Sequence, residues 1–228
     1  MDTKRILIAC SMMEDEIKAA MAQTGVEIPV VWMRRALHNS PKDMTGVIQG
    51  EIDKLQDYDE ILLAYGLCGR GTEGLVSART RLVIPRFDDC INILLCSGKR
   101  EKRALAEKGC IYLTRGWTID GEGIAGQCRR LKREYDSSMY ETIIDSIYGG
   151  YHSLSVIDTG CYDTGPVIEY AREAAELINA GVKMTDGSAR ILKGLLSGDR
   201  DENYIVLEPG ERLEHSFFQV PGEGTHFN

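Results

Sequence analysis

Long apolar runs are missing from this sequence. Hydrophobic residues make up 43% of its 228 residues, yet no segment approaches the ~18 consecutive apolar residues that a membrane-spanning helix needs. The first apolar stretch, residues 5–9, is also too short for the core of a signal peptide. We therefore expect a cytoplasmic protein that has no membrane partner.

An excess of positive charge is also missing. The chain has 27 Lys and Arg against 35 Asp and Glu, which gives a net charge of −8. Its densest basic cluster, residues 99–103, is interrupted by Glu101. Because nucleic-acid binding depends on clustered basic side chains, the composition argues against a nucleic-acid partner.

The chain is not a short disulfide-rich scaffold either. Its seven cysteines are an odd number, spread over a chain long enough for one large domain or two packed lobes. Small secreted proteins need disulfides to compensate for a small core, whereas this chain is long enough to form a core without them. The cysteines therefore favour free thiols or metal ligands in a reducing compartment.

Strand-like and helix-like segments alternate along the chain. This alternation predicts an α/β fold, with mainly parallel sheets covered by helices on both faces and two Rossmann-like lobes around a cleft. The strands are expected near residues 5–9, 28–33, 60–65, 81–85, 110–113, 153–157, 182–184 and 204–207. The helices are expected near residues 12–23, 41–56, 89–96, 99–108, 123–134, 138–148, 166–180 and 187–197.

A glycine-rich stretch over residues 115–126 is the best candidate for a hinge between the lobes or for an active-site loop. We therefore expect an N-terminal α/β lobe at 1–116 that carries the functional site. A C-terminal α/β lobe at 117–220 would pack against it, and 221–228 would form a flexible tail.

Three cysteines follow predicted strands. Cys10 comes directly after residues 5–9, and Cys68 and Cys90 follow the strands near 60–65 and 81–85. In an open parallel sheet, ligands bind outside the carboxyl ends of the strands, where residues distant in sequence converge. The sequence therefore predicts a three-thiol metal site formed by Cys10, Cys68 and Cys90.

The other cysteines have weaker claims to function. Buried cysteine often acts as a small apolar residue, and Cys96, Cys110 and Cys128 are assigned to packing. Cys161 follows the predicted strand at 153–157, so it is a reserve ligand.

Two helix-start signals lie near the predicted site. Ser11 and Glu14 match a capping box, which places Cys10 beside a helix N-terminus where the thiolate is favoured. Ser40 directly precedes a proline and is the expected N-cap of the next helix. His38, two residues before Ser40, is then also at a strand's carboxyl end and is a candidate catalytic residue or ligand.

The segment from Gly69 to Gly74 matches the pattern G-x-G-x-x-G. Only six residues separate it from the next strand, which is too few for the helix of a dinucleotide-binding unit. The glycines instead allow a ligand or cluster to approach the backbone closely, so Gly69, Arg70 and Gly71 are candidate cofactor-binding residues. Arg70 would assist with an anionic substrate.

Asp88 and Asp89 precede Cys90 directly. Asp89 suits the N-cap of the helix that follows, whereas Asp88 is not needed as a cap and is the better candidate for acid–base chemistry. Both carboxylates are kept as candidate catalytic residues.

Several segments resemble the uncharacterised family known as domain of unknown function 1638. They are Ile8–Cys10, Leu37–Asn39, Tyr65–Gly69, Ile84–Arg86 with Asp89–Cys90, Tyr112–Trp117 and Ile157–Gly160. The resemblance covers nearly the whole chain and implies an anaerobic prokaryotic setting near corrinoid-dependent methyl-transfer genes. It includes Cys10, His38, Cys68, Asp89 and Cys90. It departs at Cys161 and Asp88, the latter standing where the family has histidine.

Two kinds of metal centre fit the candidate ligands. The three thiolates with His38 suit tetrahedral zinc, and the same thiolates suit a [4Fe–4S] cluster with one iron open to substrate. We expect an enzyme of one-carbon or corrinoid metabolism that acts on a small, anionic substrate. The alternatives are a metal or corrinoid accessory protein for a methyltransferase, and a metal-free transferase with Cys10 as nucleophile.

Overall fold

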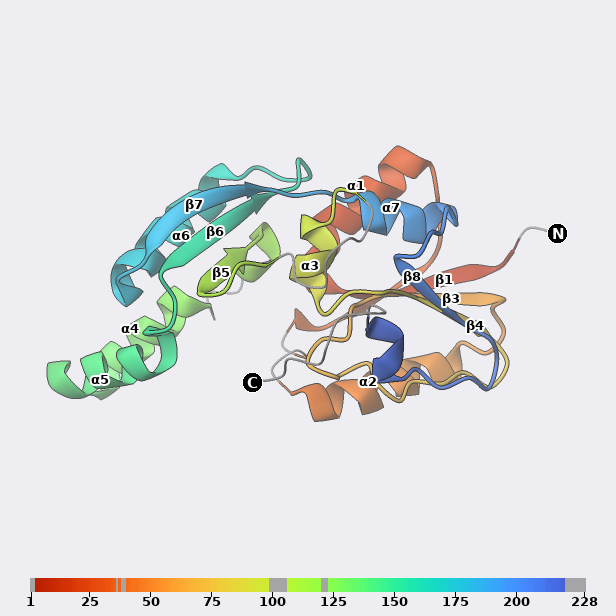
Figure 1. Cartoon of the computed structure of the whole chain (residues 1–228), viewed down its shortest axis with the longest axis horizontal. Helices are drawn as coiled ribbons and strands as arrows, with labels where there is room; N and C mark the ends of the chain where they lie inside the picture. Colours follow the sequence, from red (N-terminus) through yellow and green to blue (C-terminus); the bar gives the residue numbers. More distant parts are fainter. Residues whose placement is uncertain (1–2, 36, 38–39, 99–105, 120–122, 220–228) are drawn as a thin grey trace. The chain divides into compact units, whose positions relative to one another are not determined.

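A computed structural model describes residues 3–35, 37, 40–98, 106–119 and 123–219 (Figure 1). The chain divides into two compact units. The first unit combines residues 1–105 with 189–228, and the second unit is formed by residues 106–188. Each contains a mostly parallel sheet packed with helices, so the expected α/β fold class is confirmed.

The described residues of the first unit form a five-stranded sheet in the order β2-β1-β3-β4-β8. Four strands are parallel, and the edge strand β8 runs antiparallel to β4. The strands are β1 (Arg5–Cys10), β2 (Val30–Met33), β3 (Glu60–Ala64), β4 (Arg81–Pro85) and β8 (Tyr204–Leu207). Every residue of β3 is buried, as expected for a parallel strand covered on both faces.

Helices cover both faces of this sheet. Helices α1 and α7 lie over one face and pack against each other, and α2 lies over the other face (Figure 1). The helical segments of the unit are η1 (Ser11–Met13), α1 (Glu14–Thr24), α2 (Pro41–Lys54), α3 (Cys90–Leu95), α7 (Arg190–Ser197) and η4 (His215–Phe218). None of the helices in the described parts of the chain is long and apolar enough to cross a membrane.

The second unit contains a three-stranded parallel sheet in the order β5-β6-β7. Its strands are β5 (Cys110–Leu113), β6 (Ser153–Asp158) and β7 (Gly181–Asp186), and its helical segments are η3 (Arg115–Trp117), α4 (Ile124–Glu134), α5 (Ser137–Tyr148) and α6 (Gly165–Ile178). Helix α6 packs on β6 and β7. Its alanines at 171, 174 and 175 join Leu154 and Val156 in one apolar core.

The strands lie where the sequence predicts them, but the division of the chain differs. The sequence places a boundary at residue 116 and assigns 190–207 to the second lobe. Instead, β8 pairs with β4 and α7 packs on α1, so both elements belong to the first unit. The predicted helix at 99–108 lies mostly outside the described residues, and residues 106–108 are not helical.

Candidate functional site

The three candidate ligands lie at the carboxyl edge of the first sheet. Cys10 is the last residue of β1 and is in register with Met33, the last residue of β2. Cys68 follows the end of β3 by four residues, and Cys90 is the first residue of α3, after β4 has ended at Pro85. The strand topology thus gives all three thiols the positions that the sequence predicts.

The loop after β3 is bound tightly to the segment that precedes α3. Leu67 N donates to Phe87 O at 2.8 Å, and Cys68 N donates to Asp88 O at 2.7 Å. The two backbones approach so closely at Gly66 that a Cβ there would lie 2.6 Å from Phe87 O. Only glycine fits this position, because any side chain would separate the segments that carry Cys68 and Cys90.

Cys68 begins a left-handed turn. Cys68, Gly69 and Arg70 have φ values of 50°, 63° and 71° in succession, and Gly71 N closes the turn on Cys68 O at 3.1 Å. For a residue other than glycine, this conformation costs about 1–2 kcal/mol. Such strain is retained where the surrounding structure holds a residue for a purpose, and it concentrates at functional sites.

Cys10 is buried and Cys68 and Cys90 are half-buried, and the three thiols affect one another's ionisation. Burial, with smaller contributions from Cys10 and Asp89, raises the pKa of Cys68 to about 12. Burial also raises the pKa of Cys90 well above its usual value, with further contributions from Cys68 and Cys10. Each thiol therefore lies within electrostatic reach of the other two.

Cys10 is raised in pKa as well, chiefly by burial. The amide of Met12, the Tyr65 hydroxyl and the charge of Arg35 act in the opposite direction but do not outweigh burial. The helix start thus acts on the Cys10 pKa in the expected direction through the Met12 amide, but burial outweighs it and the net pKa is raised. Without a bound cation, all three thiols are neutral at neutral pH.

Tyr65 is the site residue that the sequence does not reveal. It is 2% exposed, and its hydroxyl has no hydrogen-bond partner of standard geometry among the described residues. Burial raises its pKa, and so do Cys10, Cys68 and Cys90. The hydroxyl thus lies where the influence of the three thiols meets. In the sequence it is one apolar-looking residue at the end of a buried strand.

The arrangement of possible metal ligands was compared with the predicted site. Within residues 3–35, 37, 40–98, 106–119 and 123–219, no group of three or more His, Cys, Asp or Glu side chains is arranged to hold a metal ion. His38 lies outside these residues. Metal ligation by Cys10, Cys68 and Cys90 therefore stays a prediction.

Asp89 caps helix α3, as the sequence predicts. Its Oδ1 accepts hydrogen bonds from Asn92 N at 2.8 Å and from Asn92 Nδ2 at 2.9 Å. The same carboxylate raises the pKa of Cys68 and Cys90. Asp88 contributes its backbone oxygen to the contact with Cys68. Catalytic roles for the two carboxylates stay predictions.

The predicted capping box at Ser11 is wrong. Ser11 lies in the short helix η1, α1 begins only at Glu14, and Ser11 Oγ donates to Met33 O at 2.6 Å. The hydroxyl thereby ties β1 to the end of β2 instead of capping a helix. Ser40 does precede α2, but its side chain makes no capping hydrogen bond.

The glycine-rich loop after Cys68 has mainly structural contacts. No helix interrupts residues 68–80, which agrees with the exclusion of a dinucleotide-binding unit. A Cβ at Gly71 would lie 2.4 Å from Met44 Sδ. The exposed Arg70 pairs with Glu73, its Nη2 lying 3.0 Å from Oε1. Cofactor binding by Gly69, Arg70 and Gly71 stays a prediction.

The remaining cysteines divide as the sequence suggests. Cys96, Cys110 and Cys128 are buried, in agreement with a packing role. Cys161 is partly exposed near the carboxyl end of β6, and its thiol donates to Thr159 O at 3.4 Å. It belongs to the second unit, and its role as a reserve ligand stays a prediction.

Comparison with known proteins gives one match. No curated protein and no solved structure matches the chain. The family model described as "Protein of unknown function (DUF1638)" matches residues 32–196, which is most of the chain and includes Cys68 and Cys90. The chain therefore belongs to the DUF1638 family.

Proposed function

We propose that Cys10, Cys68 and Cys90 bind a metal centre as thiolates, in an enzyme of one-carbon or corrinoid-linked methyl-transfer metabolism. The observation that carries the proposal is that the three cysteines follow neighbouring strands, β1, β3 and β4, at one edge of the sheet, where Cys68 and Cys10 both raise the pKa of Cys90. Burial keeps them neutral, and a bound cation is the partner that reverses this preference. A structural core has no need of such a group of thiols around a strained Cys68.

We favour a [4Fe–4S] cluster over a single zinc ion, because three cysteines match the number of protein ligands that leaves one iron of the cluster without a protein ligand. That iron would be open to substrate as a Lewis acid. Zinc with His38 is the second candidate.

The residues around the thiols suit an anionic substrate and a proton transfer. Arg35 exerts a positive field at Cys10, which favours anions at the carboxyl edge of the sheet. The buried Tyr65 hydroxyl stays neutral at neutral pH because its pKa is raised, so it can donate a hydrogen bond to a bound anion. We assign proton transfer to His38 or Asp88, hydrogen-bond donation to Tyr65, and substrate attraction to Arg35.

Two other functions are the alternatives that experiment would distinguish from this one. A metal-free transferase with Cys10 as nucleophile requires a lowered thiol pKa, whereas burial raises it. An accessory protein that carries metal or corrinoid for a methyltransferase would use the same ligands with no open position. A corrinoid or methyltransferase protein is the expected partner both of the proposed enzyme and of an accessory protein.

The first prediction concerns metal content. Protein prepared without oxygen should contain about one metal centre per chain, and a broad visible absorption would identify an iron–sulfur cluster. Cys68→Ser should remove most of the metal, because it removes one of three thiolates. Cys96→Ser is the matched control: Cys96 is also buried in the first unit, but its thiol donates to Gly98 O at 3.2 Å instead of facing the site.

Elemental analysis and circular dichroism of both variants distinguish ligation from folding. A well-folded Cys68→Ser protein with full metal content would overturn the proposed ligand set. Equal metal loss in both variants would show that the loss follows from the folding of the first unit.

A further inference from the structure

A cavity of about 590 Å³ lies at the amino ends of β1 and β3, in the first unit. Its wall comes from the start of β1, the α1–β2 connection, the start of β3 and the segment after α7. The lining residues are Thr3, Arg5, Gly25, Val26, Glu27, Ile28, Glu60, Ser197, Gly198 and Arg200. The volume suits a small metabolite.

Arg5 supplies this cavity with a guanidinium that has no carboxylate partner among the described residues. Its Nη1 donates to Leu196 O at 2.6 Å, near the carboxyl end of α7. That bond uses one of five guanidinium N–H groups and fixes the side chain beside Gly198. Arg5 is therefore a positioned cation with donors left for a ligand.

Arg200 places a second guanidinium in the wall. Its Nη1 and Nη2 donate to the two carboxylate oxygens of Glu60 at 3.0 and 2.7 Å. Glu60 is 6% exposed and also accepts from Arg81 at 3.4 Å. Arg200 Nε is buried and has no hydrogen-bond partner among the described residues. Glu60 is thus shared between two arginines, which leaves Arg5 uncompensated.

We propose that this cavity binds a small organic anion, with a carboxylate or phosphate group held by Arg5. A planar guanidinium pairs with either group through two parallel hydrogen bonds. Thr3 and Ser197 contribute hydroxyl groups to the same wall. Glu27, also in the wall, disfavours ligands of high negative charge and favours those with a single anionic group.

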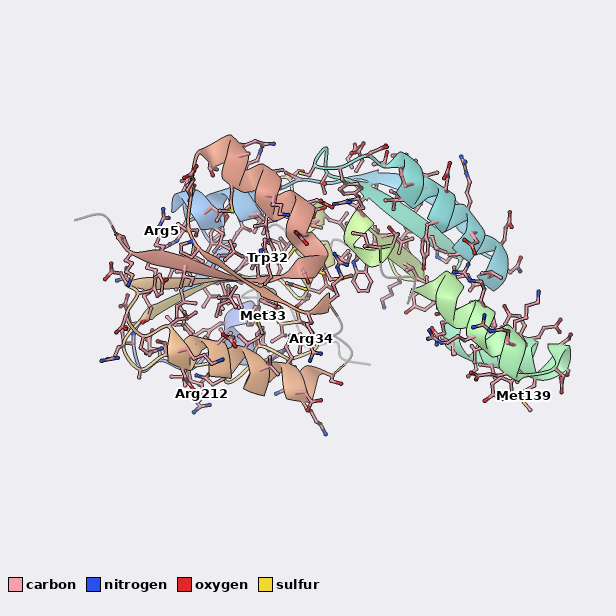
Figure 2. All side chains as sticks on the ribbon, turned by 180° about the vertical axis from the view of Figure 1, so that it is seen from behind. Arg5, Trp32, Met33, Arg34, Met139 and Arg212 are labelled. Carbon is pink, nitrogen blue, oxygen red and sulfur yellow. The ribbon has the colours of Figure 1, made fainter. Side chains whose placement is uncertain are left out.

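The cavity is separate from the thiol site. Arg5 begins β1 and Cys10 ends it, so the strand separates them by about 16 Å. Figure 2 shows Arg5 at one end of the first sheet and Met33, the register partner of Cys10, at the other. A ligand in the cavity therefore does not touch the thiols, and its binding is independent of the metal centre proposed there.

Calorimetric titration with inorganic phosphate and with acetate, a monocarboxylate, tests the proposal and identifies the anionic group. At least one of the two should bind saturably to the wild-type chain. Arg5→Met should weaken that binding by about tenfold or more, because it removes a bidentate charged contact. Arg79→Met is the matched control, since Arg79 is an exposed arginine of the same unit with only a distant pair to Asp57 at 3.9 Å.

Ser197→Asp provides a second variant, in case Arg5→Met does not fold. It adds a negative charge to the wall at an exposed position and should weaken binding without removing Arg5. Absence of saturable binding of both anions to the wild type would overturn the proposal. So would equal affinity in folded Arg5→Met and Arg79→Met proteins.

Discussion

Ionisable side chains at the two ends of the five-stranded sheet differ in their charge state. At the amino end, Glu60 is buried but ionised. Its hydrogen bonds with Arg200 lower its pKa most, burial opposes them, and Arg81 adds to the lowering, so the net pKa is lowered. At the carboxyl end, the half-buried thiols of Cys68 and Cys90 are neutral, because burial raises their pKa and neighbouring thiols add to the effect. Two arginines thus keep Glu60 ionised, whereas burial keeps the Cys68 and Cys90 thiols uncharged.

This difference separates stability from function within one sheet. A buried charge that is fully paired contributes to the folded state and is costly to break. Neutral thiols, beside a Tyr65 hydroxyl that has no hydrogen bond of standard geometry among the described residues, contribute little to folding. They are explained better by a cation that binds after folding. Substitutions at the two ends should therefore differ in what they change.

The largest effect on stability is expected at the amino end. Glu60→Gln should lower the free energy of unfolding by about 2–3 kcal/mol, because it leaves Arg200 without its carboxylate. This loss of stability is smaller than for a fully buried ion pair, because the Arg200 side chain is 18% exposed. Glu208→Gln is the control: Glu208 pairs with Arg81 at the surface and should cost less than about 1 kcal/mol.

Denaturant unfolding as a function of pH checks the same contact. The folded pKa of Glu60 is lowered, so its contribution is present above the unfolded pKa of about 4.3 and is lost as pH falls through the folded value. The difference between wild type and Glu60→Gln should therefore shrink in acid. A difference that stays constant down to the acid limit would mean that the ion pair is not its cause.

A smaller loss of stability is expected where the two loops meet at the carboxyl end. Gly66→Ala would place a Cβ 2.6 Å from Phe87 O and 2.8 Å from Asp89 N, which requires the backbone to move. We expect a loss of about 2 kcal/mol together with reduced metal content. Gly46→Ala in α2 is the control, because its Cβ would meet nothing within 4 Å and should be neutral or stabilising by up to about 1 kcal/mol.

Unfolding midpoints and metal analysis of both glycine variants separate the effects. If Gly66→Ala were as stable as Gly46→Ala and kept its metal, the contact between the loops would not position the thiols.

Local sequence patterns predicted the carboxyl end better than the amino end. Cys10, Cys68 and Cys90 stand out because each follows an apolar strand. Tyr65 does not, because an aromatic residue at the end of a buried strand is typical of a core. The Ser11 capping box was wrong because Met33 O, which comes from another strand, competes for the hydroxyl.

The amino end depends on contacts between distant parts of the chain. Glu60 and Arg200 are 140 residues apart, and no local pattern links them. The same reason explains the difference in the domain boundary. The pairing of β8 with β4 joins residues 204–207 to 82–85, and an antiparallel edge strand carries no local sign of the strand beside which it will lie.

The smallest effect tests the carboxyl end most sharply, because it removes a single oxygen. Tyr65→Phe should leave stability unchanged or raise it by up to about 1 kcal/mol, since the buried hydroxyl has no hydrogen bond of standard geometry among the described residues. Tyr148→Phe is the control, because the Tyr148 hydroxyl donates to Gln127 Oε1 at 2.7 Å and its loss should cost about 1 kcal/mol. Thermal unfolding of the two metal-free variants measures both changes. A loss in Tyr65→Phe equal to that in Tyr148→Phe would make Tyr65 a structural residue, and its proposed role as a hydrogen-bond donor to a bound anion would be wrong.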